Sequence, residues 1–234
     1  MLGSQRAFGL VRPVLVGLVL CLAALGAMPH HANAAVGKLK LSRSRGHPEV
    51  LVMTWTGAVR PGMTEKIRAA FDKHKNSFRV IEFVIDSGGG SVREGERVIG
   101  ILQDIKKTHR LYTGVLAGKR CGSMCVFIYM QGQKRFAAPA SIWLFHEVSR
   151  SDKHTHEIYE LDRAQWERLI DKYWVPEGVN PAWIAEMKKH TFQADYYQTG
   201  QDLLDHDSGI VHKPLSDERR RQVVPREPAL PQQP

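Results

Sequence analysis

The stretch FRVIEFVIDSGGGSV, Phe78–Val92, indicates the fold of this chain. Its first part, Phe78–Ser87, is β-branched and almost continuously apolar, which is typical of a strand buried on both faces of a parallel sheet. Glycines 88–90 end that strand, and the segment 91–107 then places apolar residues at helical spacing. A buried strand that runs through a tight turn into an amphipathic helix predicts an α/β domain with parallel pairing.

The same alternation of strands and helices extends to both sides of this stretch. The further elements that we expect up to residue 150 are strands over 49–57 and 111–118, a helix over 63–74 with Thr64 as its N-cap, a helix from about Ser123, and a strand that ends near His146.

After residue 150 helical patterns dominate. We expect a long amphipathic helix over 156–174, a helix over 180–190 with Asn180 as N-cap, a helix over 199–206 that begins with a capping box, and a short strand over 208–213. One domain is thus predicted over 49–212. A flexible lead-in over 35–48 precedes it, and a disordered tail over 213–234, rich in Pro, Arg and Gln, follows it.

The first 34 residues are predicted to be a secretory signal peptide. Arg6 and Arg12 precede the uncharged apolar run Val14–Met28, and Ala32-Asn33-Ala34 matches a small-x-small cleavage site. We expect cleavage after Ala34 and a periplasmic protein, because the pattern is that of a bacterial export signal. The alternative is that the run remains as a membrane anchor, for which it is short.

Charge and cysteine content narrow the function classes further. The formal net charge is +9, but the basic residues are scattered, and no basic helix or aromatic platform organises them, so we expect no nucleic-acid partner. Of the 3 cysteines, Cys21 lies in the predicted signal peptide. Cys121 and Cys125 remain as an even pair in an oxidising compartment.

Two glycine-containing turns are candidates for chemistry. DSGGGSV, Asp86–Val92, leaves backbone N–H groups that bind an oxyanion, unless it is only a tight strand-to-helix turn; it lacks the residues of a phosphate loop. CGSMC, Cys121–Cys125, puts Ser123 at the start of a buried helix, where it is either an N-cap or a nucleophile. Each turn alone leaves both interpretations open.

In their order along the chain, these turns and the segment after them resemble the Clp protease proteolytic subunit and its relatives in the crotonase-like superfamily. The chain keeps GGSV at Gly89–Val92, Ser-Met at 123–124, RFAAPAS at Arg135–Ser141 and a strand-end His146. The resemblance spans roughly residues 50–211. It implies a ClpP/crotonase-like α/β fold of repeated β-β-α and βαβ units with a parallel sheet, and a helical handle segment after residue 150.

The resemblance also implies a serine peptidase or hydrolase and assigns its residues. Ser123 is the expected nucleophile, His146 the general base and Asp195 the acid that orients the histidine. The backbone N–H groups of Gly90 and Met124 are expected to form the oxyanion hole. A peptide or protein substrate and a homo-oligomer are implied, whereas a cofactor or a metal is not.

Several departures from the family pattern shape the expected function. Gly88 replaces the usual proline, Gly122 replaces the usual alanine, and the two cysteines resemble the Cys-x-Ser-x-Cys of secreted bacterial Clp-like proteins. No segment that meets the Clp ATPase is recognisable, and the periplasm supplies no ATP, so we expect a stand-alone hydrolase without an ATPase partner. The alternatives are a catalytically inactive interaction or scaffold protein of the envelope and an acyl-CoA enzyme of the crotonase type.

Cys121 and Cys125 allow more than one chemistry. On a regular helix their Cβ atoms would lie about 5–6 Å apart, whereas a disulfide needs about 3.5–4.5 Å. If Cys121 lies in the turn before the helix the geometry relaxes, and we hypothesise a disulfide that clamps the turn of Ser123. The alternatives for the cysteines are two buried thiols, a cysteine nucleophile, and a metal site of both cysteines with His146. For Ser123, the alternative to a histidine base is a Ser–Lys pair with Lys119, as in the related signal peptide peptidase A.

Overall fold

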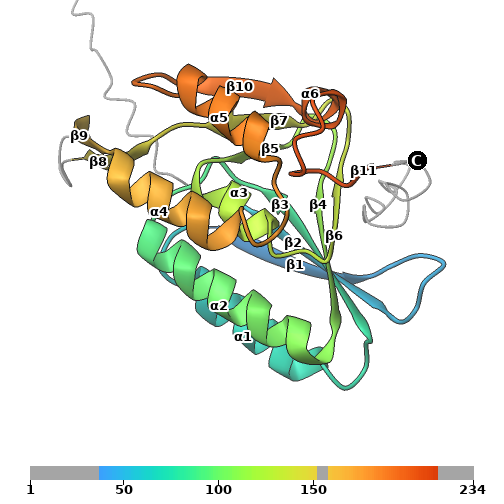
Figure 1. The fold of residues 1–234 in the computed structure, drawn as a ribbon. Coiled ribbons are helices and arrows are strands. Elements are labelled where there is room, and N and C mark those ends of the chain that lie inside the picture. The colour runs from blue at the N-terminus through green and yellow to red at the C-terminus, as the bar shows by residue number, and fades with distance from the viewer. Residues whose placement is uncertain (1–36, 152–157, 216–234) are drawn as a thin grey trace, which may run out of the picture. The chain divides into compact units, whose positions relative to one another are not determined.

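The computed structural model describes residues 37–151 and 158–215; the predicted signal peptide and residues 216–234 of the predicted tail lie outside the described residues. Its main sheet has 6 strands in the order β1-β2-β3-β4-β6-β11, all parallel except β1 (Figure 1). They are β1 (Lys38–Arg43), β2 (Val50–Thr56), β3 (Val80–Asp86), β4 (Arg110–Val115), β6 (Lys134–Ala137) and β11 (Lys213–Pro214). The mostly parallel α/β architecture predicted from the stretch 78–92 is confirmed.

Helices α1 (Met63–His74) and α2 (Val92–Thr108) pack together beside this sheet (Figure 1). Apolar side chains from both helices and from β2 and β3 share the main hydrophobic core. The buried carboxylate of Glu94 on α2 accepts a hydrogen bond from the backbone N–H of Thr64 at 2.8 Å. Thr64 is therefore not the N-cap that we predicted, because α1 begins after Gly62 and its first turn is capped from the neighbouring helix.

A second, 3-stranded sheet has the order β10-β7-β5. Strand β7 is parallel to β5 and antiparallel to β10. Its strands, and the helix that follows β5, are β5 (Arg120–Gly122), β7 (Ile142–Phe145), β10 (Tyr196–Thr199) and α3 (Met124–Tyr129). Every residue of α3 is buried, as the apolar run after Ser123 predicted.

After residue 150, the first predicted helix begins later in the chain than we expected. Residues Ile158–Asp162 form strand β9, which pairs antiparallel with β8 (Val148–Ser151), so the expected helix over 156–174 begins only at Arg163. The remaining helices are α4 (Arg163–Tyr173), α5 (Pro181–His190) and α6 (Gly200–Asp205). The predicted cap of α5 at Asn180 and the capping box of α6 are both present.

Both flanks that we expected to lack regular structure contribute strands. Strand β1 lies inside the predicted lead-in and pairs along its whole length with β2. Strand β11 lies at the start of the predicted tail and pairs with β6, and Leu215 beside it is buried. The strand expected over 208–213 is thus displaced toward the C-terminus. None of the helices within 37–151 and 158–215 has the length and apolar character needed to cross a bilayer.

The apolar side of α4 packs into the core of this chain. Its buried residues are Trp166, Leu169, Ile170 and Tyr173, and Trp174 follows them. A helical handle in this segment, as the resemblance implies, would hold a second copy of the chain only through a surface that is free within one chain. Since these side chains are already covered within one chain, they do not supply a free apolar surface for that purpose.

Arg135 on β6 ties the sheet to the C-terminal part of the domain. Its side chain is 2% exposed, and its guanidinium donates to the carbonyl oxygens of Gly209 at 2.8 Å and Ile210 at 2.9 Å. It also donates to the Glu177 carbonyl at 3.1 Å, and the Glu177 carboxylate lies 3.7 Å away. Burial lowers the pKa of this guanidinium, because removal from water disfavours its charged form. The surrounding carbonyl oxygens offset this cost by accepting its hydrogen bonds, and the Glu177 carboxylate offsets it by its opposite charge.

Candidate active site

Ser123 occupies a sharp turn between β5 and α3 with an uncommon backbone conformation. Its φ is 51° and its ψ is −127°, and a non-glycine residue adopts positive φ only when its surroundings hold it there. The Ser123 side chain makes no capping hydrogen bond, so helix capping does not account for a serine here. A serine on a strained turn from a strand into a helix is the arrangement of a nucleophile elbow.

Backbone hydrogen bonds fix this turn to two other parts of the fold. The N–H of Ser123 donates to the Leu144 carbonyl of β7 at 2.9 Å. The N–H of Gly122 donates to the Ser87 carbonyl at 3.0 Å, and the N–H of Ser87 donates to the Arg120 carbonyl at 2.9 Å. The candidate nucleophile therefore lies between β7 and the glycine turn that follows β3.

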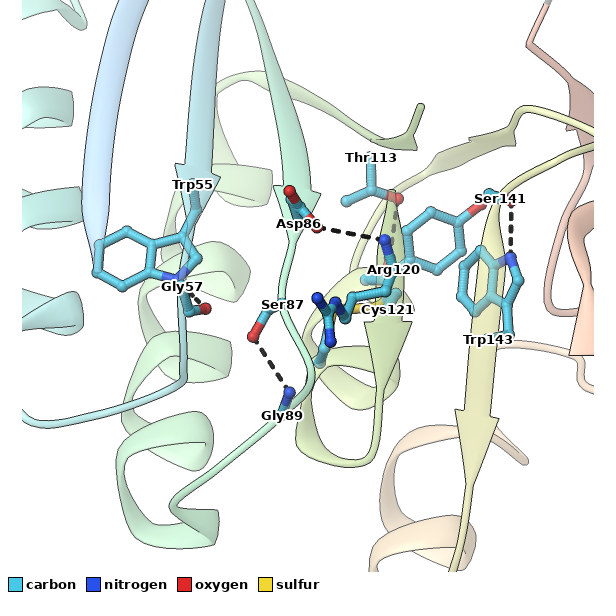
Figure 2. The surroundings of a disulfide bond; sticks show 12 residues. Trp55, Gly57, Asp86, Ser87, Gly89, Thr113, Arg120, Cys121, Ser141 and Trp143 are labelled. Atoms are coloured by element: carbon cyan, nitrogen blue, oxygen red, sulfur yellow. Dashed lines mark hydrogen bonds between the residues drawn. A yellow bond between two sulfur atoms is a disulfide. The ribbon is translucent and has the colours of Figure 1, made fainter. Parts of the chain in front are cut away.

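Cys121 and Cys125 form a disulfide with a Cα–Cα distance of 5.3 Å (Figure 2). Cys121 belongs to β5 and not to the helix, which is the placement that relieves the mismatch expected for a regular helical pair. Both cysteines are fully buried. The bond closes a covalent ring around Ser123, in agreement with the hypothesis that the cysteines support the serine turn.

Replacing both cysteines with alanine is expected to lower the free energy of unfolding by about 2 kcal/mol. This follows from the chain entropy that a cross-link between residues four apart removes from the unfolded state. Urea unfolding of the wild type and the double variant measures the difference. Intact mass spectrometry of the unreduced protein provides the control, and a mass that corresponds to two free thiols would contradict the disulfide.

Gly89 brings the two glycine-containing turns into direct contact. Its φ is 101°, and a Cβ atom at this position would lie 2.6 Å from the Ser123 Cβ and 2.7 Å from the Gly122 carbonyl oxygen. The same atom would lie 3.2 Å from the Met124 nitrogen. Only glycine allows this approach. Figure 2 shows how the neighbouring Ser87 hydroxyl receives the Gly89 N–H, at 3.2 Å, and so steadies the turn.

The N–H groups of Gly90 and Met124 are available to a ligand. Gly90 is anchored by its neighbours, because the Val59 N–H donates to the Gly89 carbonyl at 2.8 Å and the Ser91 N–H donates to the Val59 carbonyl at 2.8 Å. Within the described ranges, the N–H groups of Gly90 and Met124 donate to no protein acceptor. Two free N–H groups on touching turns can bind an oxygen that gains negative charge.

The second sheet brings Ser123, His146 and Asp195 to one edge. Ser123 directly follows β5, His146 directly follows β7, and Asp195 directly precedes β10. Because β5 and β7 are parallel and β10 is antiparallel to them, these three positions lie beyond the same ends of adjacent strands. Ser123 and His146 are half-buried, whereas Asp195 is exposed.

The three positions share this edge, but their side chains are not joined by hydrogen bonds in the described part of the chain. The His146 Nδ1 lies 2.6 Å from the carbonyl oxygen of Glu147. The Asp195 carboxylate accepts only a long hydrogen bond, 3.5 Å, from the Tyr197 hydroxyl. A carbonyl oxygen can only accept, so Nδ1 carries the proton, and in neutral His146 the lone pair is on Nε2. That is the tautomer a general base requires.

His146 and Asp195 also border one cleft of about 370 Å³, although Ser123 does not line it. The lining residues are His146, Glu147, Ser149, Leu161, Thr191, Gln193, Ala194 and Asp195. The structure thus brings the candidate base and acid to a shared hollow and leaves the candidate nucleophile at its own turn.

The geometry disfavours the other chemistries that the sequence left open. Lys119 forms an ion pair with the Asp86 carboxylate at 3.1 Å, and no hydrogen bond joins it to Ser123 among the described residues. The disulfide leaves neither Cys121 nor Cys125 as a thiolate nucleophile or a metal ligand. Over residues 37–151 and 158–215, no group of three or more His, Cys, Asp and Glu side chains is placed to hold a metal ion.

Sequence reasoning missed Glu147, which follows the candidate base directly. Its side chain is 4% exposed, and it lines the cleft that His146 and Asp195 share. A charged residue directly after a strand-end histidine and before an apolar Val148 is the signal that could have identified it. A buried carboxylate beside a candidate base is uncommon unless it has a partner or a ligand.

No family model and no curated protein matches this chain. Among solved structures, a mutant of the membrane-bound stomatin-specific protease 1510-N is similar with a TM-score of 0.55 and 13% identity, over 70% of this chain and 77% of that chain. A mutant of ClpP1 from Listeria monocytogenes is similar with a TM-score of 0.53 and 16% identity, over 71% of this chain and 91% of that chain. The chain therefore has a ClpP-like fold.

Proposed function

We propose that this chain is a periplasmic serine peptidase that acts without an ATPase. The observation that carries the proposal is the turn of Ser123, which has a positive φ, makes no capping bond and lies against Gly89, next to Gly90, whose N–H donates to no acceptor among the described residues. The ClpP-like fold agrees with it. The periplasmic location rests on the signal-peptide pattern of residues 1–34 and agrees with a disulfide, because disulfides persist in oxidising compartments.

In the proposed reaction Ser123 Oγ attacks the carbonyl carbon of a peptide bond while His146 Nε2 takes its proton. The tetrahedral oxyanion is bound by the N–H groups of Gly90 and Met124, each worth about 3 kcal/mol of transition-state stabilisation in comparable sites. His146 then protonates the leaving amine. In the second half of the reaction His146 takes a proton from water as the water attacks the acyl-enzyme. His146 then returns that proton to Ser123 Oγ as the carboxylic acid product leaves.

Asp195 completes the proposed triad after a small rearrangement. In the present geometry the Glu147 carbonyl holds His146 Nδ1 at 2.6 Å, and the exposed Asp195 faces the same cleft. Rotation of the imidazole from that carbonyl to the Asp195 carboxylate gives the histidine a charged partner that stabilises the imidazolium. We propose that substrate, or a second copy of the chain in a homo-oligomer, favours that rearrangement.

Labelling with a fluorescent fluorophosphonate tests the proposal, because the reagent phosphonylates a serine only where a base activates it. The mature protein is expected to be labelled, and Ser123→Ala is expected to lose the label by more than about 100-fold. Ser77→Ala provides the matched control, since Ser77 is an exposed serine that precedes β3, whereas the glycine turn follows the other end of that strand. Its labelling is expected to equal that of the wild type.

The absence of a hydrogen-bonded triad in the described residues favours one rival, a non-catalytic ClpP-like scaffold protein of the envelope. That rival predicts a folded protein without any Ser123-dependent label, and such a result would sink the peptidase proposal. Thermal unfolding of the same samples establishes that the protein tested is folded.

A further inference from the structure

The cleft beside His146 is acidic, in a chain whose net charge is +9. Among residues 37–151 and 158–215, its lining includes the carboxyl groups of Glu147 and Asp195 and no lysine or arginine. Its volume of about 370 Å³ is near the lower end of the range for ligand sites, about 300–1,000 Å³, which suits a single amino-acid side chain.

Glu147 is the lining residue whose charge is least compensated. It is 4% exposed, and its Oε1 is a buried atom without a hydrogen-bond partner among the described residues. Among the described residues it forms an ion pair with Arg163, whose Nη1 lies 3.5 Å from that oxygen, beyond an ordinary charge-assisted hydrogen bond. Arg163 is also engaged elsewhere, because its Nε donates to Glu167 at 3.3 Å and its guanidinium lies over the Phe192 ring.

We propose that this cleft binds a cationic group of the peptide substrate, an ammonium or a guanidinium, with the Glu147 carboxylate as its anchor. Removing a carboxylate from water costs several kcal/mol unless a cation and hydrogen bonds compensate it, and a ligand cation supplies both. The exposed Asp195 adds a second negative charge at the rim. The inference rests on the proposed function in one respect, namely that the ligand is a peptide whose scissile bond reaches the neighbouring His146.

Binding to the Ser123→Ala protein tests the inference without turnover. Three short peptides with a fluorophore at the C-terminus are compared by anisotropy: an acetylated peptide with one central lysine, its norleucine analogue, and the norleucine analogue with a free N-terminus. We expect the lysine peptide to bind at least about tenfold more tightly than the acetylated norleucine peptide, as one charge-assisted hydrogen bond gives. Tight binding of the third peptide would identify an N-terminal amine as the source of the cation.

Variants in the same background locate the anchor. Glu147→Gln keeps the shape of the side chain and is expected to abolish the preference for lysine. Glu167→Gln is the matched control, because Glu167 also pairs with Arg163 but is 42% exposed and does not line the cleft. It is expected to keep the preference.

Either of two results overturns the inference. One is equal affinity of Ser123→Ala for the lysine peptide and both norleucine peptides. This measurement needs no variant at Glu147, so it is decisive even if Glu147→Gln does not fold. The other is an unchanged lysine preference in folded Glu147→Gln. Since no step depends on hydrolysis, failure of the peptidase proposal in the labelling assay leaves this result interpretable.

Discussion

Substituting Gly89 with alanine is expected to reduce fluorophosphonate labelling of Ser123 by at least about 100-fold. The added methyl group would lie 2.6 Å from the Ser123 Cβ and 2.7 Å from the Gly122 carbonyl oxygen, so the serine turn must move. A shift of about 1 Å in a reacting group costs about two orders of magnitude in rate. The measurement is the labelling rate of the variant and the wild type at equal concentration of folded protein.

Gly62→Ala separates the collision from the cost of backbone strain. Gly62 has a φ of 98°, close to the 101° of Gly89, but a Cβ atom there would meet nothing within 4 Å. Both variants pay a strain of about 1–3 kcal/mol, yet only Gly89→Ala displaces Ser123. Equal labelling rates in the two variants would show that the contact between the turns does not position the serine.

Replacing Arg135 with methionine is expected to lower the free energy of unfolding by about 3–5 kcal/mol. The substitution removes the buried cation that faces Glu177 and leaves the carbonyl oxygens of Gly209 and Ile210 without their donor. That loss is a large part of the about 5–15 kcal/mol that stabilises an ordinary domain. Urea unfolding followed by tryptophan fluorescence measures it.

Lys134→Met is the matched control for this variant. Lys134 is adjacent in sequence and carries the same charge, but it is exposed, and its ammonium lies 5.5 Å from the centre of the Tyr112 ring. Its removal is expected to change stability by no more than about 0.5 kcal/mol. An Arg135→Met protein as stable as Lys134→Met would mean that the buried network contributes nothing net.

Local patterns in the sequence were sufficient for most helices and for the buried strands. The helix over 63–74 was predicted with its observed limits, and the cap at Asn180 and the capping box at Thr199 are present because caps depend only on residues a few positions apart. The strand β9 was missed because its partner β8 decides its conformation. The boundary between β9 and α4 could have been predicted, because Asp162 is a typical N-cap residue and its carboxylate accepts a hydrogen bond from the Gln165 N–H.

Strand β1 was missed for a related reason. The segment GKLKLSRSRG is short and basic, which suggested a loose lead-in, but its alternating residues pair with β2 at the edge of the sheet. Edge strands carry charged side chains because one of their sides is unpaired, and this makes them resemble loops in composition.

For the candidate site, the order of motifs predicted which residues meet, but not their contacts. The placement of Ser123, His146 and Asp195 at the ends of β5, β7 and β10 follows from the strand register. The bond from His146 to the Glu147 carbonyl and the burial of the Glu147 side chain depend on the packing of α4 and the loop before β10, for which a linear pattern carries no signal.

The hydrogen bond from Arg135 to Ile210 spans 75 positions of the chain, so it belongs to the contacts that form late in folding. Strands β2, β3 and β4 can pair before the rest of the domain is in place, since their connections are local. The acceptors of Arg135 and the strand β11 beside β6 come only from the last part of the domain. The buried guanidinium of Arg135 therefore gains these acceptors only when nearly the whole domain is present, and a chain that stops before Gly209 leaves it without two of them.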